Sequence, residues 1–223
     1  MIVKEASWIG NTLLELLAER GELRLLNIGS STGTFRSVDQ PYIDALIFQP
    51  LSQVATVSVW HCDARDGHGI DVELDVTSEG ALGVLSALDC NTFLVSNLLE
   101  HVGRIEDVVS LLDQLVPAGR TLIVTGPKLF PYHPDPIDNM FRPSRLELER
   151  LFPSFEIQEF RVVKSPNVMC ATTTGLWQHV RSHLAFFRQR LAVSNSERPP
   201  LERLLPVSAF CCILERKGPS AQG

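Results

Sequence analysis

Short apolar runs alternate with amphipathic stretches through most of the chain, and this alternation constrains the fold more than any other feature. Apolar runs that end in turn residues or acids are typical of buried strands, whereas an apolar face repeated every three or four residues is typical of a helix. We predict strands over 23–29, 55–63, 70–76, 92–99 and 120–127, and helices over 8–20, 41–53 and 106–115. Strands that alternate with helices form a parallel sheet covered on both faces, so the predicted fold class is α/β.

The C-terminal third departs from this alternation. Two further strand patterns stand far apart, at 155–163 and 207–216, and an amphipathic stretch over 175–191 lies between them. Such late strands predict an antiparallel pair at the edge of the sheet. The helix between them could cover an acceptor, form a dimer face, lie on a membrane surface or pack on the sheet. We predict one domain over 1–223, with an N-terminal helix within 1–21, an insertion or lid over 164–206 and a disordered tail over 218–223.

Composition excludes several classes of protein. The chain has 223 residues and a formal net charge of −6, which argues against a nucleic-acid partner because phosphate binding requires a basic surface. No apolar run approaches the ~20 residues of a membrane span, and the opening residues MIVKEASWIG lack a signal-peptide pattern. The five cysteines form no CxxC pair. We therefore expect buried thiols in the cytoplasm, and neither disulfides nor a zinc site.

Glycines and polar residues follow four consecutive predicted strands, where parallel sheets carry their ligands. In chain order these residues are Gly29 and Gly33 with the hydroxyl residues between them, Asp63, Asp75, and Asn97. Each alone has a simple structural explanation, such as a tight turn, a solvated acid or, for Asp75, a helix N-cap. Together they indicate one ligand site. The spacing lacks both GxGxxG and the Gly-Lys-Ser/Thr of a P-loop, so a pyrophosphate or triphosphate ligand is disfavoured.

Several stretches resemble class I S-adenosylmethionine-dependent methyltransferases. LRLLNIGSSTG resembles the first motif of that family, and SNLLEHV followed by PAGRTLIVT resembles a later run. GHGIDVELDVTS and FPYHPDPIDNMFRPS resemble stretches of bacterial members from sugar and natural-product pathways. The resemblance covers about residues 8–163. It implies a Rossmann-like sheet, mostly parallel with the last strand antiparallel, and S-adenosylmethionine as cofactor with S-adenosylhomocysteine as product.

The resemblance also implies which residues bind the cofactor. The methionine portion and sulfonium would contact Gly29, Ser30, Ser31 and Gly33, the ribose Asp63, the adenine Asp75 and Val76, and the transferring methyl Asn97 and Leu98. Asn27 stands where the family usually has an acid and can still form hydrogen bonds to the amino group. Ser31 replaces the middle glycine, and 34 residues separate Gly29 from Asp63, more than is usual in the family.

Methyl transfer requires that nucleophile, methyl and sulfur be aligned and, for a hydroxyl acceptor, that a proton be removed. Candidate bases, in order of preference, are His133, Asp138 and His101. Asp138 could instead form a capping ion pair with Arg142 at the start of a helix, and His101 could be a packed histidine. The two histidines could in principle hold a metal, but no ligand spacing supports this, so we predict no metal site.

These observations lead to one main hypothesis and two alternatives. We predict methyl transfer from S-adenosylmethionine to a small-molecule acceptor, at a hydroxyl of a sugar or secondary metabolite, by a chain that could form a homodimer. The first alternative is a non-catalytic S-adenosylmethionine-binding subunit or regulator, suggested by Asn27 and Ser31 in the first motif. The second is a nicotinamide-dependent oxidoreductase, which the missing GxGxxG disfavours.

Overall fold

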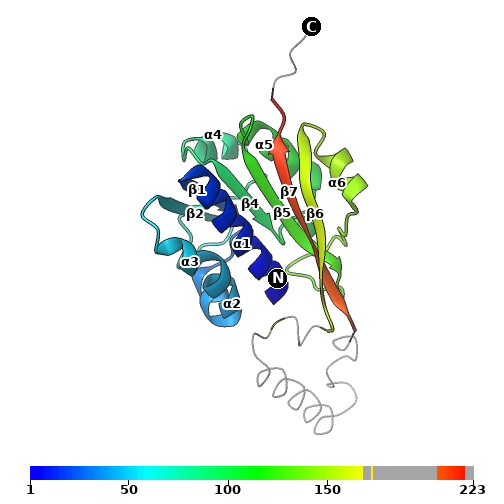
Figure 1. Cartoon of the computed structure of the whole chain (residues 1–223). Coiled ribbons are helices and arrows are strands. Elements are labelled where there is room, and N and C mark those ends of the chain that lie inside the picture. The colour runs from blue at the N-terminus through cyan, green and yellow to red at the C-terminus, as the bar shows by residue number, and fades with distance from the viewer. Residues whose placement is uncertain (168–171, 173–204, 219–223) are drawn as a thin grey trace.

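In the computed structural model, the described residues (1–167, 172 and 205–218) form a seven-stranded sheet in the order β3-β2-β1-β4-β5-β7-β6 (Figure 1). The strands are β1 (Leu23–Ile28), β2 (Val57–Asp63), β3 (Val72–Glu73), β4 (Thr92–Ser96), β5 (Thr121–Leu129), β6 (Phe155–Ser165) and β7 (Val207–Arg216). Strands β1 to β5 pair in parallel, whereas β7 is antiparallel to both of its neighbours. The predicted α/β class and the mostly parallel sheet are therefore confirmed.

Helices cover both faces of the sheet. They are α1 (Val3–Arg20), α2 (Pro41–Ile43), α3 (Gln49–Ser52), α4 (Ala81–Ser86), α5 (Ile105–Leu115) and α6 (Arg145–Leu151). The side chains of α1, α2 and α3 pack in one core cluster, and those of α4, α5 and α6 pack in another. Helix α1 starts before the predicted boundary, because the Glu5 carboxylate accepts the N–H of Ile2 at the N-cap. It ends at Gly21, whose φ of 76° is the left-handed conformation expected of a glycine C-cap.

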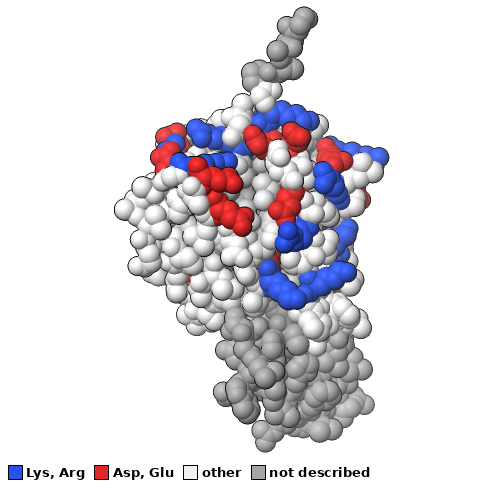
Figure 2. All heavy atoms as spheres, viewed as in Figure 1, with Lys and Arg blue, Asp and Glu red and all other residues white. Residues whose placement is uncertain are grey.

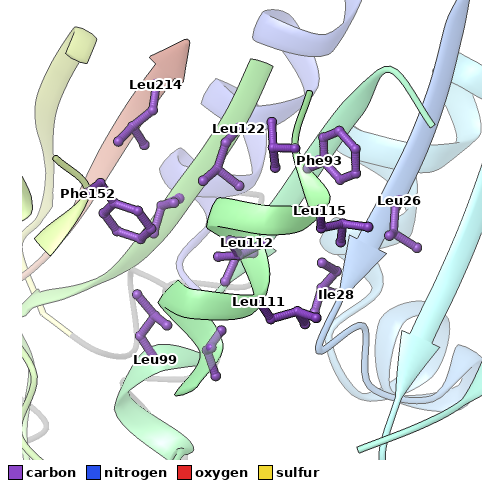
Figure 3. Close-up of a cluster of buried hydrophobic side chains, with 14 of the residues drawn as sticks. Leu26, Ile28, Phe93, Leu99, Leu111, Leu112, Leu115, Leu122, Phe152 and Leu214 are labelled. Atoms are coloured by element: carbon purple, nitrogen blue, oxygen red, sulfur yellow. The ribbon is translucent and has the colours of Figure 1, made fainter. Parts of the chain in front are cut away.

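Alternate residues of each central strand enter the two cores. Leu25, Leu94 and Ile123 face α1, while their neighbours face α5. Figure 3 shows the core on the face covered by α4, α5 and α6, where three leucines of α5 lie over the sheet. Its labelled residues are Leu26, Ile28, Phe93, Leu99, Leu111, Leu112, Leu115, Leu122, Phe152 and Leu214. A central strand that is apolar on both faces is what buried parallel sheets require. The sheet is thereby held rigidly enough to fix the positions of its strand ends.

The segment between β1 and β2 explains the long spacing between Gly29 and Asp63. The helix predicted over 41–53 is present, but it is built from α2, the π-helical stretch Asp44–Phe48 and α3, and another π-helical stretch, Phe35–Asp39, precedes it. A π turn accommodates an extra residue within a helix. The added length is therefore taken up above the sheet, and β2 still pairs with β1 in parallel.

The C-terminal strands confirm the predicted antiparallel pair. Strands β6 and β7 pair along their whole length, and β7 also pairs with β5, so that β6 forms the edge of the sheet. The predicted helix over 175–191, most of the predicted insertion, the tail after Gly218 and Cys170 lie outside the described residues. The other four cysteines are buried, as expected.

Other predicted boundaries differ. Strand β3 contains only two paired residues, where the pattern predicted seven over 70–76.

In the part of the chain that the structure describes, no helix is long and apolar enough to span a bilayer. Figure 2 shows acidic and basic side chains interspersed over the upper part of the face seen in Figure 1, so both signs of charge meet there.

Candidate functional site

A cavity of about 580 Å³ opens at the carboxyl ends of β1, β2 and β4. This volume lies in the range of sites that enclose a small-molecule ligand. Nine of the ten predicted cofactor-binding residues line it, namely Asn27, Gly29, Ser30, Ser31, Asp63, Asp75, Val76, Asn97 and Leu98. His101 and His133 line the same cavity. The structure thus brings the predicted strand-end residues to one place.

Gly29, at the end of β1, is required by both conformation and contact. Its φ of 71° is the left-handed conformation that glycine adopts without strain. A Cβ at this position would lie 2.9 Å from Cδ1 and 3.1 Å from Cβ of Leu98. The glycine therefore lets the loop after β1 approach the loop after β4 across the cavity floor.

Replacing Gly29 by alanine is expected to lower the free energy of unfolding by about 1–3 kcal/mol, because the left-handed backbone and the contact with Leu98 both penalise a Cβ. Urea denaturation measures the change. Gly83→Ala is the matched control, since a Cβ at Gly83 would meet no heavy atom within 4 Å. Equal stability of the two variants would contradict the assignment.

The loop after β1 is tied to the end of β2. The N–H of Ser31 donates to Oδ2 of Asp63 at 2.7 Å, and the N–H of Arg65 donates to Oδ1 at 3.0 Å. Ser31 has a φ of 54°, so the residue that replaces the usual middle glycine keeps a glycine-like backbone. Asp63 therefore reaches the site despite the long spacing that precedes it.

Arg36 supports the same loop and was not singled out from the sequence, where a lone arginine in a polar loop has no distinguishing pattern. It is 6% exposed, and burial lowers its pKa. Its guanidinium donates to the carbonyl oxygens of Ser30, Ser31 and Gly69. One buried side chain thus holds the backbone of two loops together.

Gly33 does not line the cavity, and its predicted contact with the cofactor stays a prediction. Its N–H donates to the carbonyl of His68 at 2.7 Å. A Cβ on Gly33 would lie 3.0 Å from that oxygen and 3.3 Å from Cα of Gly69. The residue is a glycine because two loops pack here backbone to backbone.

Asn27 lines the cavity and carries one buried acceptor atom without a partner among the described residues. It is 3% exposed, and its Nδ2 lies 3.1 Å from Nδ1 of His61. Burial, assisted by the charge of Arg36, lowers the pKa of His61 to about 4, so its Nδ1 can accept from the amide. Oδ1 of Asn27 is buried without a hydrogen-bond partner among the described residues. A buried acceptor on a cavity wall suits a ligand that carries a donor such as an ammonium group.

The lowered pKa of His61 predicts a pH dependence of stability. Burial and Arg36 lower it, while Asp71 and Asp44 oppose the shift. His61 is protonated below about pH 6.5 in the unfolded chain but only below about pH 4 in the folded chain. This contribution to stability is therefore complete above pH 6.5 and is lost as the pH falls from 6.5 to about 4. The loss amounts to at most about 3 kcal/mol. Urea denaturation across this range should show a shallower slope for His61→Gln; an unchanged slope would contradict the prediction.

Hydrogen bonds also fix the side chains of Asp75, predicted to contact the adenine, and Asn97, predicted to contact the methyl group. Oδ1 of Asp75 accepts from the N–H and hydroxyl of Thr77 at 2.8 and 2.7 Å, which lowers the pKa of Asp75. Asp75 is not the N-cap of α4, because Gly80 holds that position. Asn97, with a φ of 51°, donates from Nδ2 to Oε1 of Glu5 at 2.7 Å.

Glu5 connects this wall to the N-terminal helix and was missed in the sequence. Its side chain is fully buried and accepts from Ile2, Asn97 and Thr125. The acid lies before the helix predicted over 8–20, where an exposed residue would be expected. Only the fold brings Glu5 of α1 against Asn97, which follows β4, and Thr125 in the middle of β5.

The three candidate bases have different positions. His133 and His101 line the cavity with ring centroids 5.3 Å apart. Asp138 does not line it: its carboxylate is fully buried and accepts from the Arg142 guanidinium at 2.8 Å and from the N–H of His133 at 3.1 Å. Burial alone would raise the pKa of Asp138, but these bonds and one from Met140 lower it to about 2. Asp138 therefore contacts the His133 loop without lining the cavity, and its predicted role as a base stays a prediction.

The ion pair between Asp138 and Arg142 is present, but the helix expected at its position is not. Residues 138–142 form a loop, and α6 begins only at Arg145, where Ser144 and Glu147 form a capping box.

Glu100 lies beside His101 and His133 and was not singled out from the sequence. Burial raises the pKa of Glu100 to about 7.

No protein-family model and no curated protein sequence matches the chain. Solved structures do match it. Coclaurine N-methyltransferase, bound to N-methylheliamine and S-adenosylhomocysteine, has a TM-score of 0.56 at 10% identity, with 95% of this chain and 70% of that chain covered. The CurJ carbon methyltransferase has a TM-score of 0.52 at 11% identity, and the match covers 96% of this chain but only 54% of the other. The [4+2]-cyclase SpnF has a TM-score of 0.50 at 13% identity, with 94% and 82% covered. At these identities the likeness shows the fold, and the cyclase illustrates that the fold alone does not fix the reaction.

Proposed function

We propose that this chain, which has the fold of class I S-adenosylmethionine-dependent methyltransferases, binds S-adenosylmethionine and transfers its methyl group to a small-molecule acceptor. The observation that carries the proposal is the unpaired, buried Oδ1 of Asn27 on the wall of a cavity that Asp63 also lines. An acceptor atom for an ammonium group and a carboxylate for ribose hydroxyls stand at neighbouring strand ends, β1 and β2. This pairing suits an amino-acid nucleoside better than a purely apolar ligand.

The residues of the cavity fit the cofactor. Oδ1 of Asn27 would accept from its amino group, and Gly29 lets the loop that would contact the methionine chain pack against Leu98. Each oxygen of Asp63 accepts one backbone N–H and retains capacity for a ribose hydroxyl. Asp75 and Val76 contact the adenine, while Asn97 and Leu98 form the wall beside the methyl group. The cofactor supplies an electrophilic methyl on its sulfonium.

The acceptor occupies the side of the cavity lined by His101 and His133. We propose a hydroxyl acceptor, a sugar or a secondary metabolite, because an imidazole can take the hydroxyl proton. His133 is the preferred base: its Nδ1 lies 2.9 Å from the carbonyl of Pro131, which leaves Nε2 for the acceptor. His101 is the second candidate. We propose Asp138 as a positioning residue.

Isothermal titration calorimetry with S-adenosylhomocysteine, beside NADH, tests the cofactor. We expect micromolar affinity for the first and no heat with the second. Transfer of labelled methyl from S-adenosylmethionine to a panel of hydroxylated compounds then tests the activity. Binding without transfer to any compound would favour a non-catalytic cofactor-binding subunit, the function that asparagine at position 27 suggests. Binding of NADH alone would overturn the proposal.

A further inference from the structure

Three potential ligand groups meet beside the cavity. Glu100, His101 and His133 each offer one atom, and these atoms lie within 4.8 Å of one another. Glu100 is 1% exposed, and within the described part of the chain its Oε1 has no hydrogen-bond partner. That oxygen lies 3.9 Å from Nε2 of His101. A buried carboxylate oxygen without a donor is costly, which indicates that something else satisfies it.

The hydrogen bonds of the two histidines leave their remaining nitrogens free to bind. Nδ1 of His101 lies 2.6 Å from the carbonyl oxygen of Ile137, and Nδ1 of His133 lies 2.9 Å from that of Pro131. A carbonyl oxygen only accepts, so each Nδ1 donates and each Nε2 carries the lone pair. Histidines that bind metals are held in this way by an outer shell of carbonyls and carboxylates. Asp138, 3.1 Å from Nδ1 of His133, completes such a shell.

We propose that Glu100, His101 and His133 bind a divalent first-row metal ion at the acceptor side of the cavity. Two imidazole nitrogens and one carboxylate form a ligand set that Mn²⁺, Fe²⁺, Co²⁺ and Zn²⁺ accept. Adjacent ligands of an ion with bonds of about 2.1 Å lie roughly 3 Å apart, so the three side chains draw together on binding. His133 can follow, because its side chain is 35% exposed.

The role of this ion rests on the proposed function, whereas its binding does not. Both histidines line the cavity, so the open positions of the ion face the space assigned to the acceptor. A hydroxyl oxygen bound there would pass its proton to solvent water more readily than the unbound hydroxyl does. His133 would then serve as a metal ligand in place of a free base, and an acceptor with two neighbouring oxygens would be preferred because three positions of an octahedral ion remain open.

Cobalt binding tests the site without cofactor or acceptor. Chelator-treated protein is titrated with Co²⁺, followed by visible absorption, and with Mn²⁺ in a calorimeter. We expect one ion per chain, and at least tenfold weaker binding in Glu100→Gln and His133→Gln. His68→Gln is the matched control, because His68 lies outside the cluster and does not line the cavity. Circular dichroism confirms that each variant is folded, and His101→Gln replaces any that is not.

The outcomes separate this site from the proposed function. Wild-type protein that binds S-adenosylhomocysteine but no Co²⁺ or Mn²⁺ would overturn the metal site alone. Undiminished metal binding in Glu100→Gln and His133→Gln would overturn the assignment to these residues. Glu100 does not line the cavity, so Glu100→Gln is expected to bind S-adenosylhomocysteine as the wild type does while losing the metal. Loss of S-adenosylhomocysteine binding in the wild type would instead refute the proposed function.

Discussion

Replacing Asp63 by alanine is expected to weaken the binding of S-adenosylhomocysteine about 100-fold. Two charge-assisted hydrogen bonds to ribose hydroxyls contribute about 3 kcal/mol together, and each 1.4 kcal/mol is a factor of ten. The carboxylate also accepts the N–H groups of Ser31 and Arg65, so its loss is expected to loosen the loop after β1, which we propose contacts the methionine portion. Calorimetric titration of both proteins measures the ratio of dissociation constants.

Asp66→Ala is the matched control for this experiment. It removes the same charge three residues later, from an exposed position that does not line the cavity. We expect its affinity for S-adenosylhomocysteine to stay within about twofold of the wild type, since an exposed charge at this distance is screened by solvent and salt. Similar losses in both variants would mean that long-range charge and not a direct contact at Asp63 governs binding.

Glu5→Ala is expected to cause the largest loss of stability. The fully buried carboxylate accepts from the N–H of Ile2, from Nδ2 of Asn97 and from the hydroxyl of Thr125. Removing it leaves these donors unsatisfied and opens a cavity, at a cost of about 3–5 kcal/mol. For a chain of this length that corresponds to a fall of about 6–20 °C in Tm. Differential scanning calorimetry measures it.

Glu15→Ala controls for the change of an acid on the same helix, because Glu15 is exposed. It is expected to alter stability by less than about 0.5 kcal/mol. Glu5→Gln keeps the shape and one acceptor oxygen but adds two N–H donors, so an intermediate loss is expected. If Glu5→Ala unfolds within 1 °C of Glu15→Ala, the three hydrogen bonds do not hold α1 to the strand ends.

The strands and the polar residues that follow them could be predicted, because buried parallel strands are marked by local sequence patterns. β7 was predicted with the bounds Val207–Arg216 that it has, since its residues are buried almost throughout. The strand ends could be predicted for the same reason: a glycine or an acid that ends an apolar run must lie at one edge of the sheet. Gly29 and Asp63 follow from this rule alone, whereas Asn27 was assigned only through the family resemblance.

Residues that act through long-range contacts could not be predicted. Glu5 meets Thr125 only because α1 packs on the sheet where Thr125, midway along β5, lies beside the end of β4. Glu100 and His133 approach each other because the loop after β5 folds back over the loop after β4, and nothing in the 33-residue interval marks this. β3 was predicted too long because an alternating pattern does not reveal how many residues of an edge strand find a partner.

The buried guanidinium of Arg36 has a consequence for how a ligand enters. It bonds to the carbonyls of Ser30, Ser31 and Gly69, so the loop after β1 has its shape before any ligand arrives. A preorganised loop loses little further freedom on association, which favours affinity. Amide hydrogen exchange in this loop should therefore change little when S-adenosylhomocysteine binds. In the proposed binding mode, the same bonds are expected to disfavour cofactor analogues enlarged at the methionine end, because widening the loop would break them.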